Sequence, residues 1–265
     1  MTSIAETMVK AAVEASGAIL DIYRSGAKAQ TKGDGSPVTL ADERGEEIIL
    51  KHLKENHPDI PVLAEESVAA GDIPEIGDTF FLVDPLDGTK EFVSGTDEFT
   101  VNIALIKDGV PIIGVVTTPA IGGVYVGEIG QGASLQAYDF DKGEPTGELQ
   151  TISVRTKPQT GAVAMTSRSH GSPETQKMLE RLGVTDVLPA GSSLKFCAIA
   201  EGRADLYPRL GRTMEWDTGA AHAVLKAAGG EVYVFDDQER GAPLAYGKTA
   251  RGYDNPHFLA VGGEM

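Results

Sequence analysis

The stretch Phe81-Leu82-Val83-Asp84-Pro85-Leu86-Asp87-Gly88-Thr89-Lys90 runs from an apolar strand pattern directly into two carboxylates that lie three residues apart. Pro85 fixes its own φ and has no N–H to donate, so we expect a sharp turn there. Such a turn would aim Asp84, the Leu86 carbonyl and Asp87 at one point. These are the hard oxygen ligands that divalent cations, and magnesium in particular, prefer. The same residues are also common turn formers, so a plain β-turn is the alternative interpretation of this stretch.

Two other segments place carboxylates at the ends of predicted elements. The apolar run 62–64 predicts a strand that ends at Glu65. The helical pattern over 215–228 begins with acids that include Asp217, where a carboxylate also interacts favourably with the helix dipole. Asp217 therefore has a purely structural interpretation beside a functional one. If these acids meet in the fold, like charges about 4 Å apart repel by about 4 kcal/mol even at an effective dielectric near ~20, so metal ions or protons must neutralise them.

The pattern before residue 147 predicts helices followed by an antiparallel sheet. Apolar residues recur every three or four positions from Ile4 to Ile19, as on one face of a helix. Thr39 and Asp42 resemble a capping box at the start of a second helix. The predicted strands are the short apolar runs 61–64 and 80–83 and an antiparallel meander over 100–137.

A polar segment that contains Gly and Pro, residues 139–147, marks a boundary between two halves. We expect an N-terminal metal-binding α+β half over 1–147 and a C-terminal α/β substrate-binding half over 148–265, joined in one compact catalytic unit. The second half alternates strand and helix patterns, which favours α/β packing. Its predicted strands are 162–165 and 231–235, and its predicted helices are 174–182, 194–200 and 215–228.

The overall composition excludes several classes of function. The 265 residues carry 23 Lys and Arg against 39 Asp and Glu, which gives a net charge of −16 at pH 7. Nucleic-acid coats and proteins of anionic membrane surfaces need a basic footprint, so neither partner is expected. The single Cys197 excludes an intrachain disulfide and a Cys-rich zinc site, and its apolar helical surroundings predict a core position. No apolar run approaches the roughly 20 residues of a membrane span, so we expect a soluble protein of the cytoplasm.

The acidic segments together resemble the inositol monophosphatase family of magnesium-dependent, lithium-sensitive phosphomonoesterases. The matching pieces, in the family's order and spacing, are Ala64-Glu65-Glu66-Ser67, the stretch 84–89 and Trp216-Asp217. The resemblance covers nearly the whole chain and implies a layered αβαβα sandwich of the α/β (α+β) class. It implies that two or three Mg²⁺ ions are held by Glu65, Asp84, the Leu86 carbonyl, Asp87 and Asp217. It also implies that Asp42, Glu65 and Thr89 position or activate the attacking water, although Asp42 has the simpler interpretation of a helix-capping residue.

Within this family the chain is similar to the 3′(2′),5′-bisphosphate nucleotidase branch. The pieces that carry this similarity are Asp87-Gly88-Thr89-Lys90-Glu91-Phe92, Ser167-Arg168-Ser169-His170 and Gly191-Ser192-Ser193-Leu194-Lys195-Phe196-Cys197. A second phosphate needs cations in an acidic protein, which Lys195 and Arg209 can supply. Without the resemblance, the simpler interpretation of Lys195 is a helix lysine whose ammonium group extends to solvent. Arg209 and His170 are then interpreted as ordinary surface loop residues. The substrate-binding residues that the resemblance implies are Glu65, Leu86, Asp87, Gly88, Thr89, His170, Ser192, Lys195, Arg209 and Asp217.

We therefore expect a Mg²⁺-dependent 3′(2′),5′-bisphosphate nucleotidase that hydrolyses adenosine 3′,5′-bisphosphate to AMP and phosphate by attack of an activated water. The branch also implies action on the sulfated analogue and a place in sulfate assimilation. One alternative is an inositol or broad sugar-phosphate monoesterase, and another is a nucleotide-binding sensor without catalysis. The expected partner is a small phosphorylated nucleotide, and the expected assembly is a monomer or homodimer. Peripheral attachment to the inner membrane is the alternative location if the source is a bacterium.

Overall fold

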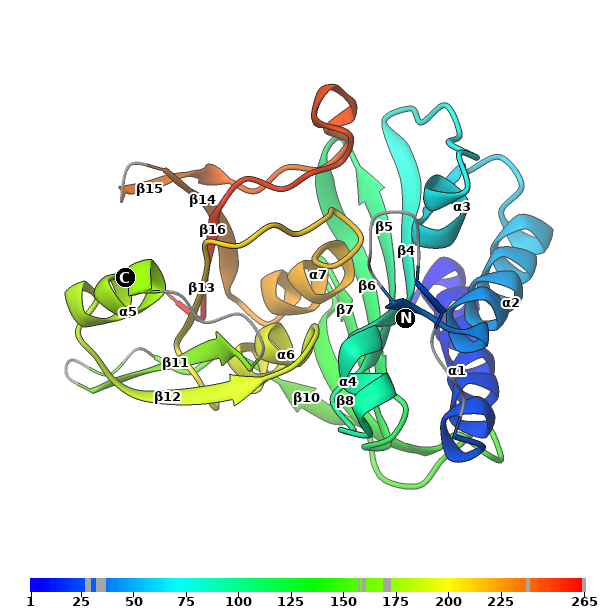
Figure 1. Ribbon diagram of the computed structural model, residues 1–265, viewed down its shortest axis with the longest axis horizontal. Coiled ribbons are helices and arrows are strands. Elements are labelled where there is room, and N and C mark those ends of the chain that lie inside the picture. The colour runs from blue at the N-terminus through cyan, green and yellow to red at the C-terminus, as the bar shows by residue number, and fades with distance from the viewer. Residues whose placement is uncertain are drawn as a thin grey trace.

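Sheets and helices alternate in layers. The computed structural model describes residues 1–26, 30–31, 37–156, 158, 161–168, 173–236 and 239–263. Within these ranges, α1 (Ser3–Arg24) and α2 (Leu40–Asn56) cover one face of a first sheet (Figure 1). α6 (Leu194–Ala200) and α7 (Gly219–Ala227) lie between the first sheet and a second one, and α5 (Pro173–Arg181) covers the far side of the second sheet. This arrangement confirms the layered αβαβα fold expected from the sequence.

The first sheet contains the predicted meander. Its strands are β3 (Val62–Ala64), β4 (Thr79–Asp87), β5 (Thr100–Lys107), β6 (Val110–Thr118), β7 (Gly123–Glu128), β8 (Gly132–Asp139), β9 (Glu144–Pro145) and β10 (Gln150–Ile152). The order is β10-β8-β7-β6-β5-β4-β3, with β9 paired to β8. Strands β5 to β8 are successive antiparallel neighbours, as expected, and β3 is parallel to β4. β10 belongs to this sheet although it follows residue 147, and the division of the chain at that residue stays a prediction.

The second sheet is mixed. Its strands are β11 (Ala162–Ser167), β12 (Val184–Ala190), β13 (Leu206–Arg209), β14 (Glu231–Asp236), β15 (Glu239–Pro243) and β16 (Phe258–Val261). The order is β12-β11-β13-β16-β14-β15, and β11 is parallel to both of its neighbours. The sequence predicted β11 and β14. The edge strand β12 was missed because residues 185–189 are exposed and therefore lack the apolar pattern of a buried strand. Shorter elements complete the described chain: β1 (Gln30–Thr31), β2 (Pro37–Val38), α3 (Glu65–Ala69), α4 (Thr89–Ser94) and a 3-10 turn at Thr249–Arg251.

Helix α1 buries the face that the sequence predicted. Thr2 caps α1 by accepting a hydrogen bond from the Ala5 N–H, and the buried stripe includes Met8 and Ile19. At the start of α2, the predicted capping box between Thr39 and Asp42 is present. None of the helices in the described ranges combines the length and the apolar character needed to cross a bilayer.

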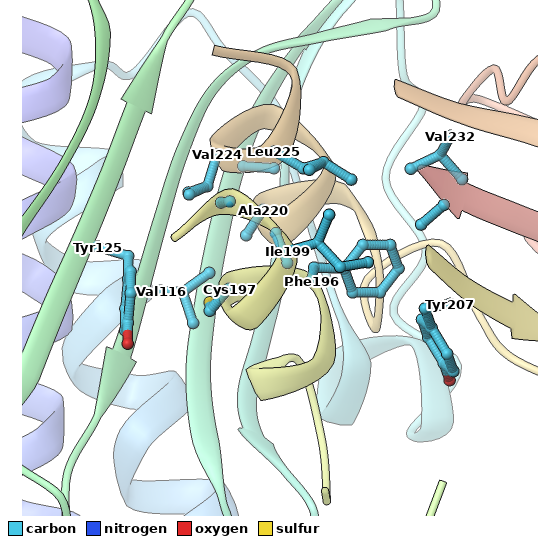
Figure 2. Packing of buried hydrophobic residues seen from close by; sticks show 14 of the residues in the cluster. Val116, Tyr125, Phe196, Cys197, Ile199, Tyr207, Ala220, Val224, Leu225 and Val232 are labelled. Carbon is cyan, nitrogen blue, oxygen red and sulfur yellow. The ribbon is translucent and has the colours of Figure 1, made fainter. Parts of the chain in front are cut away.

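The layer between the sheets depends on close contact between α7 and the first sheet. A Cβ atom at Gly114 in β6 would lie 2.0 Å from the Ala220 carbonyl oxygen, and one at Gly127 in β7 would lie 2.4 Å from the Val224 Cα. Only glycine therefore lets the helix backbone approach these strands so closely. Figure 2 shows the core on both sides of this layer, with Val116 and Tyr125 from the first sheet and Tyr207 and Val232 from the second. Cys197 of α6 is fully buried in the same cluster, as its surroundings predicted.

Two local predictions were wrong in ways that bear on the site. β4 does not turn at Pro85 but continues to Asp87, with an irregular register between Asp84 and Asp87 that marks a bulge. The third helix of the C-terminal part begins at Gly219 rather than at Glu215. The Glu215 carboxylate instead accepts hydrogen bonds from the backbone N–H groups of Gly247 and Lys248, a long-range interaction that holds residues 215–218 outside the helix.

Candidate active site

The parallel pair β3 and β4 brings the first two acids together. Ala64 is in register with Val83, so Glu65 and Asp84, which follow them, lie side by side. In the bulge after Asp84, the Leu86 N–H donates a hydrogen bond of 3.0 Å to the Asp84 Oδ1. That bond fixes the orientation of a carboxylate that is 1% exposed.

Asp217 reaches the same point from the loop before α7. Its Oδ2 accepts a hydrogen bond of 2.9 Å from the Met214 N–H, and its carbonyl oxygen accepts one of 3.2 Å from the Ser193 hydroxyl. One carboxylate oxygen from each of Glu65, Asp84 and Asp217 lies within 4.8 Å of the other two. Converging carboxylate oxygens of this kind are the donor set that Mg²⁺ prefers, so the residues present fit a divalent metal. Asp87 lines the same pocket beside this cluster.

The charges of the cluster oppose one another. Burial raises the pKa of Asp84 well above its usual range, and repulsion from Glu65, Asp87 and Asp217 raises it further. Burial and then repulsion from Asp87 and Glu65 likewise raise the pKa of Asp217 well above its usual range. Burial, together with Glu65 and Glu91, raises the pKa of Asp87 to about 6, although the Lys195 ammonium and a hydrogen bond from Ser193 act in the opposite direction. Without a cation, the folded site therefore resists holding all of these groups ionised.

This repulsion predicts a pH-dependent effect of Asp87→Asn on the metal-free protein. The folded-state pKa of Asp87, about 6, exceeds its ordinary value of 3.8. A raised pKa favours the folded state at low pH, and that contribution is lost as pH rises through 6. In chelator at pH 8, we expect the free energy of unfolding of Asp87→Asn, measured by urea denaturation, to exceed that of the wild type by up to about 3 kcal/mol. The difference should vanish near pH 4, and a difference that is the same at both pH values would contradict the repulsive cluster.

The Thr89 hydroxyl and the Asp42 carboxylate lie beside the cluster. The Thr89 Oγ1 is 3.2 Å from the Asp42 Oδ1 and 3.2 Å from the Leu86 carbonyl oxygen. The other oxygen of Asp42 accepts hydrogen bonds from the Thr39 N–H and hydroxyl. Asp42 is thus the capping residue that the sequence suggested and also an acceptor for Thr89.

These residues border a pocket of about 380 Å³. The carboxylates make up the acidic wall of this pocket, and Ser192, Lys195 and Arg209, which line the same pocket, make up its basic wall. Among the described residues, the buried Ser192 Oγ and Arg209 Nε have no hydrogen-bond partner. The structure thus brings together every predicted site residue except two. Asp42 lies behind Thr89 rather than in the pocket lining, and His170 lies outside the described residues.

Sequence reasoning missed residues that hold this site from behind. Glu46 in α2 accepts hydrogen bonds of 2.8 Å from the backbone N–H groups of Glu66 and Ser67, which fixes the start of α3 at Glu65. The Glu98 carboxylate likewise accepts a hydrogen bond of 2.8 Å from the Gly191 N–H. Both acids are far in sequence from the amides that they bind. The available signal for Glu46 was its helical spacing with the apolar Ile49 and Leu53, and none was available for Glu98.

Comparison with known proteins agrees with this geometry. Residues 1–258 match the inositol monophosphatase family. The chain is 42% identical to a protein named 3′(2′),5′-bisphosphate nucleotidase CysQ from Escherichia coli O157:H7 over 245 residues, which are 91% of this chain and 92% of the relative. The fold is similar to the crystal structure of CysQ from Bacteroides thetaiotaomicron, with a TM-score of 0.80, 35% identity and coverage of 99% and 98% of the two chains. An inositol monophosphatase from Anabaena shares the fold at 24% identity, with a TM-score of 0.75 and coverage of 98% and 91%.

The match over nearly the full length, the layered fold and the cluster of Glu65, Asp84 and Asp217 lead to one conclusion. This chain belongs to the inositol monophosphatase family.

Proposed function

We propose that the protein is a Mg²⁺-dependent 3′(2′),5′-bisphosphate nucleotidase that removes the 3′-phosphate of adenosine 3′,5′-bisphosphate to leave AMP. The observation that carries this proposal is a single pocket lined by carboxylates and by two cations, the buried Lys195 and the half-buried Arg209. The acidic wall suits metal and the reacting phosphate, and the basic wall suits a second phosphate. The relatives named as bisphosphate nucleotidases support the same substrate.

The metal would be held by Glu65, Asp84, the Leu86 carbonyl, Asp87 and Asp217. Bound there, divalent cations neutralise the carboxylates, attract the phosphate and lower the pKa of water. The residues themselves contribute orientation. The bonds from Leu86 to Asp84 and from Met214 to Asp217 hold two of the carboxylates in place before any ligand arrives.

Thr89 and Asp42 would orient the attacking water. A hydroxyl has one proton to donate, and Asp42 is the charged acceptor within reach of the Thr89 Oγ1. When Thr89 donates to Asp42, the lone pairs of its oxygen remain free to accept a hydrogen bond from water. Glu65 would accept a hydrogen bond from the second O–H of that water. With both of its O–H groups held by Thr89 and Glu65, the water would direct an oxygen lone pair toward phosphorus.

The basic wall would bind the phosphate that does not react. Burial lowers the pKa of Lys195 to about 8. The Asp87 carboxylate raises this pKa and the Arg209 guanidinium lowers it further. The amine is therefore mostly protonated at pH 7. The unpaired Ser192 hydroxyl and Arg209 Nε offer two further donors. A bisphosphate would satisfy these donors, whereas a monophosphate would leave them without a partner.

A substrate panel tests the proposal. Purified protein with Mg²⁺ should release phosphate from adenosine 3′,5′-bisphosphate and from its sulfated analogue far faster than from inositol 1-phosphate. The activity should disappear with chelator and fall with lithium. A preference for inositol phosphates would refute the substrate assignment. Metal-dependent nucleotide binding without turnover would identify a sensor instead. A role in sulfate assimilation and a cytoplasmic location belong to this proposal as well.

A further inference from the structure

One carboxylate beside the basic wall joins three separate segments of the chain. Glu98 lies between α4 and β5, and its two oxygens accept hydrogen bonds of 2.8 and 2.7 Å from the Nε and Nη2 of Arg168. The Glu98 Oε2 also accepts the 2.8 Å bond from the Gly191 N–H. Arg168 in turn donates to the Pro189 carbonyl oxygen at 3.0 Å. Glu98 therefore links the end of β11 to the turn that follows β12.

The backbone of Glu98 is also confined on two sides. A Cβ atom at Gly191 would lie 2.7 Å from the Glu98 carbonyl oxygen, and one at Gly88 would lie 3.1 Å from the same atom. Gly88 precedes α4 on the acidic side of the pocket, and Gly191 precedes Ser192 on the basic side. The Glu98 backbone thus lies in close contact with both Gly88 and Gly191.

The turn that Glu98 holds contains a strained residue. Ser192 has a φ of +42°, a conformation that costs a residue with a Cβ free energy and persists only where its surroundings fix it. Lys195 donates from its Nζ to the carbonyl oxygens of Ala190 and Ser192, and Glu98 binds the Gly191 N–H between them. These bonds hold the turn at three consecutive residues. The result is a buried Ser192 Oγ that borders the pocket and has no partner among the described residues.

We propose that Glu98 is a positioning residue for the second phosphate of the substrate, acting through the Gly191–Ser192 turn and Arg168. This inference rests on the proposed function, because it assigns the basic wall to a second phosphate. A structural ion pair is the competing explanation. The Arg168 side chain is 45% exposed, and exposed pairs contribute little to stability, so the pair with Arg168 alone does not account for the arrangement.

The test compares two substrates that differ only in the second phosphate, adenosine 3′,5′-bisphosphate and adenosine 3′-monophosphate. We expect Glu98→Ala to raise the KM for the bisphosphate about 10-fold, as for the loss of one charged hydrogen bond, with kcat changed by less than about 3-fold. The KM for the monophosphate should stay within about 2-fold of the wild type. Glu98→Gln keeps an acceptor for the Gly191 N–H and should give an intermediate KM. Asp141→Asn, which removes the exposed Arg24–Asp141 pair outside the pocket, is the matched control and should leave KM and kcat unchanged for both substrates.

The outcomes separate the two hypotheses. A wild-type enzyme without activity on the bisphosphate would refute the proposed function. If the wild type is active, three results would refute the role of Glu98 alone. They are Glu98 variants whose KM changes equally for both substrates, variants in which only kcat changes, and variants in which neither constant changes. If Glu98→Ala does not fold by circular dichroism, Glu98→Gln decides the question, because it preserves the size of the side chain.

Discussion

Asp84→Asn should reduce kcat on adenosine 3′,5′-bisphosphate by at least about 1,000-fold at saturating Mg²⁺. Asp84 is the most deeply buried carboxylate of the cluster, at 1% exposure, and Glu65, Asp87 and Asp217 all repel its charge. An amide of the same size removes one charge from the metal site and leaves the fold intact. The measurement is steady-state phosphate release over a range of Mg²⁺ concentrations.

Stability separates this loss of function from a loss of structure. Without metal, Asp84→Asn should be at least as stable as the wild type at pH 8, because it relieves repulsion among buried carboxylates. With Mg²⁺, the wild type should gain thermal stability and the variant should gain much less. The surface variant Asp141→Asn should behave as the wild type in both conditions. An Asp84→Asn enzyme that keeps more than about a tenth of its activity would show that the cluster does not carry the reaction.

Lys195→Met should produce the largest change in substrate preference. The amine is 5% exposed in the basic wall, and methionine fills a similar volume without the charge. We expect kcat/KM for adenosine 3′,5′-bisphosphate to fall about 100-fold, because a desolvated charge–phosphate contact is worth about 3 kcal/mol. For adenosine 3′-monophosphate the loss should be less than about 3-fold.

The comparison between substrates is the decisive readout for Lys195. Its Nζ also donates to the carbonyl oxygens of Ala190 and Ser192, so part of any loss could come from the turn itself. A shift of the turn that disturbed the acidic wall would affect both substrates. Equal losses on both would therefore mean that Lys195 does not recognise a second phosphate. Lys142→Met, at an exposed lysine outside this pocket, is the control for the loss of a charge.

The parts of the fold that depend on local pattern could be predicted from the sequence. The capping box of Thr39 and Asp42 and the alternation along 100–137 are encoded by neighbouring residues, and both are present in the structure. The acidic site was predictable for a related reason. Glu65 and Asp84 each follow an apolar strand, and such strand ends are recognisable before their pairing is known.

The errors arose where distant residues decide the local structure. The segment 215–218 has a helical pattern, but the buried Glu215 carboxylate binds the amides of Gly247 and Lys248 and prevents the helix from beginning there. The bulge in β4 depends on pairing with β5, which Pro85 alone does not reveal. Glu98 makes its contacts with residues 70 and 93 positions away, and no pattern around it predicts them. Such interactions become visible only in the three-dimensional structure.

Anomalous diffraction from crystals grown with Mn²⁺ in place of Mg²⁺ would locate the metal ions relative to the carboxylates. One divalent-metal site is assigned to the carboxylates of Glu65 at the start of α3, Asp84 in β4 and Asp217 in the loop before α7. This assignment predicts anomalous density bounded by Glu65, Asp84 and Asp217, and its loss in crystals of Asp217→Asn. Density elsewhere on the molecule, or none between these three side chains at millimolar Mn²⁺, would contradict it.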